Sequence, residues 1–351
     1  MEAQQYVRNN IAAMAGYKSG EQPQSGRFIK LNTNENPYPC SPRVLEAVQK
    51  AVGTLQLYPN ASGLPFRRAA SQILGVDPDW ILCGNGSDDI LTIVTRALVG
   101  EADKLRLPYP SYILYKSLAQ LQGARAQEVK FSPDWQMTDA FSEVSPDLKL
   151  FFLPNPNSPS GTMLKKEELL SLAKKLPCPL LIDEAYVDFA GQNCMDLVKE
   201  QENIMISRTF SKSYSLAGVR FGYLVARPEL IEQFIKVKDS YNCDALSIAA
   251  ATAAIEDQAW LQQNVRKILA TRERLTEKMR QLGFSVLDSH ANFTWNTKPG
   301  TPLKPIYEAL RDQNIFIRYM VYDGWGEGLR ISVGTDDQID ELIEAIKALN
   351  V

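Results

Sequence analysis

Residues 203–226 read NIMISRTFSKSYSLAGVRFGYLVA, which is two short, dense apolar runs separated by a polar loop. Similar runs occur at 149–154 (KLFFLP) and 179–183 (PLLID). Dense rather than alternating runs are typical of strands that are buried on both faces. Since helical patterns separate these runs, the sequence predicts an α/β fold, with a mostly parallel sheet between layers of helices.

Two of the predicted helices carry clear boundary signals. Residues 41–53 (SPRVLEAVQKAVG) begin with Ser41 as the expected N-cap and end at a glycine. Residues 87–100 (SDDILTIVTRALVG) repeat this pattern, with Ser87 as the expected cap.

The last hundred residues have a different pattern. Residues 249–283 predict one long helix, and short strand-like runs follow before a closing helix that Thr335 is expected to cap. We therefore expect two domains: a large α/β domain formed by residues 40–245, and a small α+β domain formed by residues 1–39 together with 246–351.

The composition is that of an ordinary globular protein, with 351 residues of which 45% are hydrophobic and 23% charged. The formal net charge of −3 provides no basic surface for nucleic acid or for an anionic membrane. No apolar stretch approaches the roughly 20 residues that span a bilayer, and the N-terminus lacks the pattern of a secretory signal. We therefore expect a cytoplasmic protein whose partners are small molecules.

Cysteine and histidine usage limits the chemistry further. The five cysteines are odd in number and widely spaced, with no CxxC pair, which favours reduced thiols over a zinc site. The single histidine, His290, rules out a multi-histidine metal site. An enzyme with this sequence is therefore expected to hold no metal and to move protons with another group.

Lys212 lies between two serines in the polar loop of the opening stretch. A loop lysine is usually a solvated surface charge, but a charge between two predicted core strands favours a functional site. The hydroxyls of Thr209 and Ser211 and the guanidinium of Arg220 suit a phosphate group. The Lys212 amine can then bind the phosphate as well, or act as a nucleophile if a nearby cation or desolvation lowers its pKa.

Three other segments could contribute to a site. In residues 84–91 (GNGSDDIL), small residues precede a helix at Ser87, which is either an anion site formed by free N–H groups or an ordinary capped turn. Asp183 ends a buried strand, where open α/β sheets bind ligands, although a structural salt bridge or a cap for the next segment would explain it equally well. Glu184 is expected to point to the opposite side of the chain from Asp183 and to be structural. Residues 153–162 (LPNPNSPSGT) either shape a pocket or form only a proline-rich turn.

Together, these groups match the needs of an enzyme that uses pyridoxal 5′-phosphate (PLP). Backbone N–H groups, hydroxyls and an arginine can hold the phosphate, a carboxylate can pair with the pyridinium nitrogen, and a lysine can hold the aldehyde as a Schiff base. The freed lysine can also move the substrate proton, so the single histidine is no obstacle.

The motifs also resemble, in order and over nearly the whole chain, those of the fold-type-I (class I/II) aminotransferases. The lysine motif of that family is similar to SRTFSKSYSLAGVRFGY (207–223), and its ring-binding motif is similar to LIDEAYVDF (181–189). Further similar motifs are GNGSDDIL (84–91), YPSY (109–112) and LYPN (57–60).

The resemblance implies cofactor contacts for individual residues. Lys212 is the implied Schiff-base lysine, Asp183 the partner of the pyridine nitrogen, and Tyr186 a partner of the phenolate oxygen. Tyr112 is expected to stack on the ring, and Tyr58 to enter the phosphate site of a partner subunit, so the resemblance implies a homodimer with shared active sites. The implied phosphate ligands are Gly86, Ser87 and Asp88 in the cradle, the hydroxyls of Thr209 and Ser211, and Arg220.

One turn departs from the pattern of the family. The family's turn usually reads NPNNPTG, and its second central asparagine binds the phenolate oxygen of the cofactor. Here the turn reads NPNSPSG, with Ser158 at that position. Because serine is shorter, this contact falls either to Ser158 or to Asn157.

The resemblance extends to the substrate site. Within the family, the sequence resembles those members that transfer the amino group of histidinol phosphate to 2-oxoglutarate, in histidine biosynthesis. Two of the implied arginines would equally suit the carboxylate of an aromatic amino acid, and decarboxylation of threonine phosphate is a third alternative. A PLP-binding regulator without turnover is disfavoured, because no helix-turn-helix segment flanks the core. The implied substrate ligands are Tyr17, Asn36, Tyr241, Asn242, Arg318 and Arg330.

Overall fold

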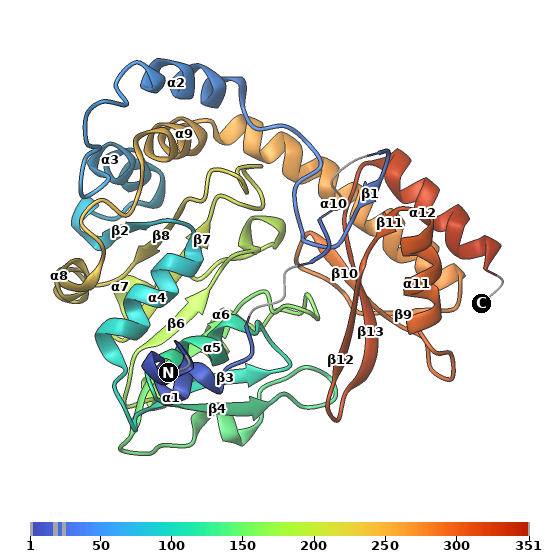
Figure 1. Ribbon diagram of the computed structural model, residues 1–351, viewed down its shortest axis with the longest axis horizontal. Coiled ribbons are helices and arrows are strands. Elements are labelled where there is room, and N and C mark those ends of the chain that lie inside the picture. The colour runs from blue at the N-terminus through green and yellow to red at the C-terminus, as the bar shows by residue number, and fades with distance from the viewer. Residues whose placement is uncertain (1–2, 17–19, 23–25, 350–351) are drawn as a thin grey trace.

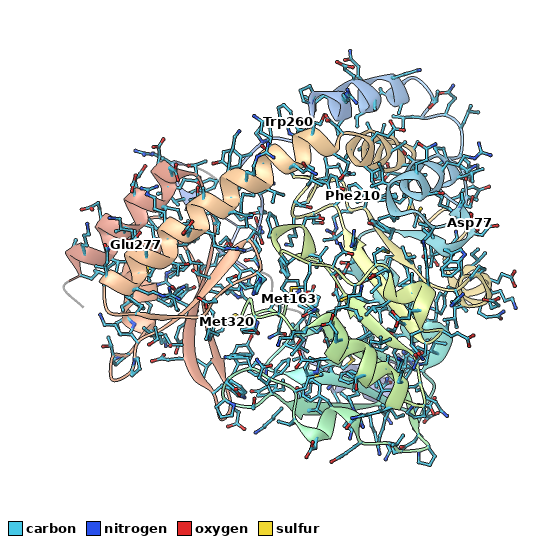
Figure 2. The ribbon with its side chains drawn as sticks, turned by 180° about the vertical axis from the view of Figure 1, so that it is seen from behind. Asp77, Met163, Phe210, Trp260, Glu277 and Met320 are labelled. Carbon is cyan, nitrogen blue, oxygen red and sulfur yellow. The ribbon has the colours of Figure 1, made fainter. Side chains whose placement is uncertain are left out.

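The structure, a computed structural model, describes residues 3–16, 20–22 and 26–349. It has two domains, and the long helix α10 (Gln258–Gln281) connects them (Figure 1). In the reverse view of Figure 2, Phe210 lies inside the large domain, whereas Glu277 lies on the part of α10 that belongs to the small domain.

A seven-stranded sheet forms the centre of the large domain. Its strand order is β2-β8-β7-β6-β5-β3-β4, and all neighbours are parallel except β8, which runs antiparallel to β2 and to β7. The predicted α/β class with a mostly parallel sheet is therefore confirmed. The strands are β2 (Ile81–Gly84), β3 (Lys104–Tyr109), β4 (Arg125–Lys130), β5 (Leu148–Pro154), β6 (Leu180–Asp183), β7 (Ile204–Thr209) and β8 (Gly222–Val225).

Helices cover both faces of this sheet, because the central strands are apolar on both faces. In β5, Phe151 and Leu153 belong to the core on one face, whereas Leu150 and Phe152 belong to the core on the other. The first face packs against α2 (Pro42–Val52), α3 (Leu64–Leu74), α6 (Lys166–Lys175), α7 (Leu197–Glu200) and α9 (Ala245–Glu256). The second packs against α4 (Ser87–Leu98), α5 (Leu114–Leu121) and α8 (Pro228–Val237).

The small domain is built on a four-stranded antiparallel sheet, with the order β12-β13-β10-β9. Its strands are β9 (Ser285–Val286), β10 (Phe293–Thr297), β12 (Arg318–Tyr322) and β13 (Gly326–Ser332). A separate parallel pair joins β1 (Ile29–Lys30) to β11 (Ile315–Phe316), and the further helices are α11 (Lys304–Asp312) and α12 (Asp336–Ala348). The expected cap of the last helix is confirmed, since the Thr335 hydroxyl accepts a hydrogen bond from the backbone N–H of Gln338.

Short helices complete the described part of the chain. They are η1 (Ala3–Tyr6), α1 (Asn9–Ala12), η2 (Pro78–Trp80), η3 (Asp139–Ser142) and η4 (Val187–Phe189). Among the residues described, no helix has the length and apolar character needed to cross a bilayer.

The prediction of one long helix over residues 249–283 is wrong, because the segment forms two helices. α9 ends at Glu256, and the side chain of Asp257 caps α10 by accepting from the backbone N–H of Trp260. The same carboxylate accepts a hydrogen bond of 2.5 Å from the hydroxyl of Ser41, the N-cap of α2. A contact with a helix more than two hundred residues away therefore stabilises the break.

The packing divides the domains differently from the expected ranges. Because α9 packs against α2 and α3, we propose that the large domain extends to residue 256 rather than 245. The N-terminal residues also differ from expectation, since α1 packs against α5 and Asn10 Nδ2 donates to the carbonyl of Gln120 at 2.9 Å. We therefore propose that α1 belongs with the large domain rather than with the small one.

Candidate active site

Lys212 lies where the two domains meet, in the loop between β7 and β8. Its Nζ donates to the backbone carbonyl of Thr33 at 3.1 Å and lies 5.9 Å from the centre of the Tyr186 ring. Thr33 follows β1 of the small domain, whereas Tyr186 follows β6 of the large one. The lysine singled out by the sequence is thus half-buried between a segment from each domain.

Hydrogen bonds on both sides of the lysine hold its loop. The backbone N–H of Ser211 donates to Thr209 Oγ1 at 3.2 Å, and the Ser213 hydroxyl donates to the carboxylate of Asp188. The Ser213 carbonyl accepts from Asn36 Nδ2 at 3.0 Å. Asn36, predicted to contact substrate, therefore also holds the lysine loop.

The N-terminus of α4 forms a cradle beside Arg220. Gly86 is the N-cap of α4, with a φ of 82°, and Ser87 is the first helical residue with no capping bond from its side chain, so the expected Ser87 cap is wrong. A Cβ on Gly86 would lie 2.6 Å from Arg220 Nη2, and one on Gly222 would lie 2.5 Å from the backbone nitrogen of Ser87. Both positions must therefore be glycine for the guanidinium and the helix N-terminus to come this close.

Anion-binding groups converge on this cradle. Arg220 Nη1 donates to the Ser211 hydroxyl and Nη2 to the carboxylate of Asp88, both at 3.2 Å. Tyr112 Oη donates to the same carboxylate at 3.2 Å. A guanidinium, hydroxyls including that of Thr209, and the N–H groups of a helix N-terminus form a donor set that suits a phosphate.

Asp183 ends β6 and is only 4% exposed. Its carboxylate accepts hydrogen bonds from the hydroxyls of Tyr115 (2.8 Å) and Ser207 (3.1 Å). Burial raises the pKa of this carboxyl from 3.8 to about 6, although these two hydrogen bonds oppose the increase. Among the described residues Asp183 forms no salt bridge, but its carboxylate also accepts a hydrogen bond from the backbone N–H of Ala185 in the next segment, at 3.2 Å. A cationic ring nitrogen would favour the ionised form.

Glu184 is structural, as expected. It lies on the other side of the chain, where its carboxylate accepts from Arg208 Nε at 2.9 Å and Nη2 at 2.7 Å. The two adjacent acidic residues therefore differ in chemistry: one forms a buried ion pair, and the other has only neutral donors.

Three contributors to the site were not predicted from the sequence. Tyr115 and Ser207 bind Asp183, and Asn34 Nδ2 donates to the hydroxyl of Tyr186 at 3.0 Å. Tyr115 had a weak signal, since it is a tyrosine within an otherwise apolar helix face three residues after Tyr112. Asn34 is buried with a φ of 57°, but nothing in its neighbouring sequence indicates a partner 152 residues away.

The turn that departs from the family pattern contacts the small domain. The Ser158 hydroxyl accepts a hydrogen bond from Arg330 Nη1 at 3.1 Å. Asn157 Nδ2 donates to Ser160 Oγ at 2.9 Å, and Asn157 Oδ1 is a buried oxygen without a hydrogen-bond partner among the described residues. An acceptor oxygen cannot by itself donate to a phenolate, so a contact of Asn157 with that oxygen would require its amide to turn.

The two predicted substrate arginines are neighbours in the small-domain sheet. Arg318 of β12 is the direct cross-strand partner of Arg330 of β13, so both side chains are on the same face. Arg330 Nη2 also donates to the carbonyl of Asn32 at 3.1 Å, and its guanidinium lies 5.4 Å from the centre of the Phe293 ring.

Of the remaining predicted residues, two tyrosines lie apart from these groups, and an asparagine lies beside the cradle. Tyr58 and Tyr241 stack on each other with ring centres 4.6 Å apart, and Tyr58 is 82% exposed. Asn242 Nδ2 donates to the carbonyl of Cys83 and to Asp89, beside the N-terminus of α4. Tyr17 lies outside the described residues.

Comparisons with known proteins agree with this geometry. The model of the family described as aminotransferase class I and II matches residues 27–346. The histidinol-phosphate aminotransferase of Rhodopirellula baltica is 54% identical over 98% of this chain and 97% of its own, and that of Trichormus variabilis is 46% identical over 98% and 99%. The crystal structure of histidinol-phosphate aminotransferase from Sinorhizobium meliloti with pyridoxal-5′-phosphate superposes with a TM-score of 0.88 and 26% identity, covering 98% of each chain.

These matches confirm both the resemblance and the expected fold type. The chain therefore belongs to the class I and II aminotransferases, and within them to the family of histidinol-phosphate aminotransferases.

Proposed function

We propose that the protein is a PLP-dependent enzyme that transfers the amino group of histidinol phosphate to 2-oxoglutarate. One observation carries this proposal: two cations bind consecutive backbone carbonyls, Arg330 that of Asn32 and Lys212 that of Thr33, each at 3.1 Å. Consecutive Cα atoms are about 3.8 Å apart, so a small substrate can bring its amine to Lys212 while its anionic end meets Arg330.

The charge of the site supports a phosphorylated donor. Like charges directly opposite on neighbouring strands repel each other, so the cross-strand pair of Arg318 and Arg330 favours an anion between them. A phosphate carries more negative charge than a carboxylate and accepts more hydrogen bonds. This favours histidinol phosphate over an aromatic amino acid.

The residues fit PLP by the chemistry of their donors, with the phosphate ligands at one end and a buried carboxylate at the other. When bound, PLP supplies the electron sink for the substrate carbon that carries the amine. We propose that Arg220, Ser211 and Thr209 hold the phosphate and that Asp183 keeps the ring nitrogen protonated. Lys212 Nζ, once free, would take the proton from the amine-bearing carbon of the substrate and deliver it to the cofactor.

Tyr186, with Ser158 or Asn157, is proposed to bind the phenolate oxygen. Tyr112 is proposed to lie against the ring, since its hydroxyl is held by Asp88 in the cradle. The N–H groups of Ser87 and Asp88 complete the proposed phosphate site, and Gly86, whose own N–H donates to the carbonyl of Gly84 at 2.8 Å, allows the close approach of Arg220. The expected cytoplasmic location remains a prediction.

A homodimer with shared sites is part of the proposal. α2 and the loop after it carry exposed apolar side chains, of which Leu45, Val52, Leu55 and Leu57 are 50–64% exposed and Tyr58 is 82% exposed. Exposed apolar patches of this kind mark protein interfaces, and two-fold dimers are the commonest oligomers. Sedimentation is expected to give a dimer; a monomer with normal turnover would contradict the shared site.

The proposed reaction can be tested by single-turnover spectroscopy of the PLP-loaded protein. Histidinol phosphate is expected to bleach the visible band at least about 100-fold faster than phenylalanine at equal concentration, since the latter lacks the phosphate. Threonine phosphate is expected to release no carbon dioxide. Lys212→Ala is the control, because it should lack the reaction while remaining folded. Faster bleaching by phenylalanine would overturn the proposed donor.

A further inference from the structure

The loop that carries Tyr58 has little packing beneath it. We refer to residues 55–62, between α2 and α3, as the Tyr58 loop. A cavity of about 370 Å³ lies beside it, lined in part by Ala61 and Ser62 of the loop and by Lys238 and Asn242. Inside the loop, Asn60 Oδ1 accepts from the backbone N–H groups of Ser62 and Leu64, but these bonds only shape the turn.

Lys238 is the residue that ties this loop to the rest of the domain. Its Nζ donates to the carbonyl of Ala61 at 3.0 Å, which is the only hydrogen bond between the Tyr58 loop and a distant segment in the described part of the chain. The other oxygens around Nζ are the carbonyls of Asp239 (2.9 Å) and Ser240 (3.3 Å) and Asn242 Oδ1 (3.3 Å).

This arrangement is an ammonium ion surrounded by neutral oxygens. An ammonium group has three N–H donors, so four acceptors within 3.3 Å use all of them. No carboxylate of the described residues lies within 4.0 Å of Nζ to form an ion pair. Three of these four hydrogen bonds are exposed to solvent, so without Lys238 the oxygens would bind water instead. The link between Ala61 and residues 239–242 would then be lost, and the loop position therefore depends on Lys238.

The same short segment also contacts Tyr58 and the phosphate cradle of its own subunit. Tyr241, three residues after Lys238, stacks on Tyr58 with an angle of 16° between the rings. Asn242 Nδ2 donates to Asp89 Oδ2 at 2.9 Å, and this oxygen also accepts from the backbone N–H of Asn85 at 2.9 Å. One lysine therefore orders a segment that links the exposed tyrosine to the cradle at α4.

We propose that Lys238 is a positioning residue, a clamp that orients Tyr58 toward the phosphate site of a second copy of this chain. The inference rests on the proposed PLP function and homodimer. It assigns Lys238 no contact with the cofactor, because its donors are already used by Ala61 and residues 239–242.

The clamp can be tested by ligand binding to the PLP-free protein, without turnover. The ligands are PLP and pyridoxal, which lacks the phosphate, and the variants are Lys238→Met, Tyr58→Phe and the double variant. Lys236→Met is the matched control, because Lys236 lines the same cavity but, among the residues that the structure describes, its Nζ donates only to Gln233. Sedimentation of each variant measures the dimer.

Lys238→Met and Tyr58→Phe are each expected to raise the Kd for PLP about tenfold and to leave the Kd for pyridoxal within about twofold. The double variant should bind PLP no more weakly than Tyr58→Phe alone, because both changes remove one interaction. Lys236→Met should match the unmodified protein.

Equal losses for PLP and pyridoxal, additive effects in the double variant, or dissociation of the Lys238→Met dimer would each overturn the clamp. Tyr58→Phe distinguishes this failure from that of the proposed function. If that variant binds PLP normally, the shared phosphate site is wrong. If it binds PLP weakly while Lys238→Met binds normally, only the clamp is wrong.

Discussion

Two adjacent carboxylates at the end of β6 are both buried, yet removing their charges should have opposite effects on stability. Asp183 accepts hydrogen bonds only from neutral donors, which are the hydroxyls of Tyr115 and Ser207 and the backbone N–H of Ala185. We predict that Asp183→Asn stabilises the PLP-free protein at pH 8. The amide keeps the shape of the side chain, and the hydroxyls can turn to donate to its oxygen or accept from its nitrogen.

The magnitude follows from the pKa of this carboxyl, which burial raises from 3.8 to about 6. Because the pKa is higher in the folded state, the ionised carboxylate destabilises the folded protein above pH 6, and this cost disappears below pH 3.8. The difference corresponds to about 3 kcal/mol at pH 8. Asp183→Asn should recover up to about this amount at pH 8 and about half of it at pH 5.

Glu184→Gln is the matched control, since it removes the neighbouring charge. That change leaves the guanidinium of Arg208, whose side chain is 14% exposed, without its carboxylate partner. Breaking a buried ion pair in this way costs roughly 3–5 kcal/mol. The control is therefore expected to lose stability where Asp183→Asn gains it.

The assay is denaturant unfolding of the PLP-free proteins at pH 8 and pH 5, at one fixed protein concentration because a dimer unfolds in a concentration-dependent way. With PLP bound, the unmodified protein should become more stable than Asp183→Asn. The variant loses the counter-charge for the ring nitrogen and so binds PLP more weakly. The reasoning is refuted if Asp183→Asn is less stable than the unmodified protein at pH 8, or if its gain is the same at both pH values.

Three further changes test the substrate end and the domain junction. Arg330→Met should raise the KM for histidinol phosphate about 100-fold in steady-state assays while PLP affinity is kept, because it removes a charge-assisted contact to the anion; a change in PLP affinity alone would contradict this role. Ser158→Ala removes the oxygen that accepts from Arg330 and should lower kcat/KM about tenfold; an unchanged kcat/KM would show that the bond does not position the arginine. Trp325→Ala removes the ring whose centre lies 4.4 Å from that of Trp135 across the domain junction. It should lower the free energy of unfolding by about 2 kcal/mol, measured by denaturant unfolding. An unchanged free energy of unfolding would mean that this contact does not anchor the β12–β13 hairpin.

Local patterns predicted much of the fold correctly. The dense apolar runs are strands of the central sheet because a side chain buried on either face must be apolar, and this requirement is visible in any short window of sequence. The N-cap at Ser41 was predictable for the same reason, since its hydroxyl binds an N–H only two residues away. The loop at Lys212 also stood out, because a charge between two core strands is costly unless it has a function.

The errors occurred where distant contacts override local preference. Residues 249–283 have helical character throughout, but Asp257 ends one helix because its carboxylate binds Ser41 and caps the next helix. Ser87 has the chemistry of a cap, but the N-cap is Gly86, one residue earlier, at a φ of 82° and at a position where the approach of Arg220 leaves no room for a Cβ.

The sequence by itself thus determined the class of fold, the lysine loop and the groups able to bind a phosphate, because each depends on residue type and short-range spacing. Only the tertiary structure decided the environment of those groups. It left Asp183 with neutral donors, placed Arg330 and Lys212 on consecutive carbonyls, and surrounded Lys238 with oxygens of two loops. Burial and hydrogen-bond partners arise from segments that are far apart in the chain, and they set the pKa and position of a side chain whose identity alone does not.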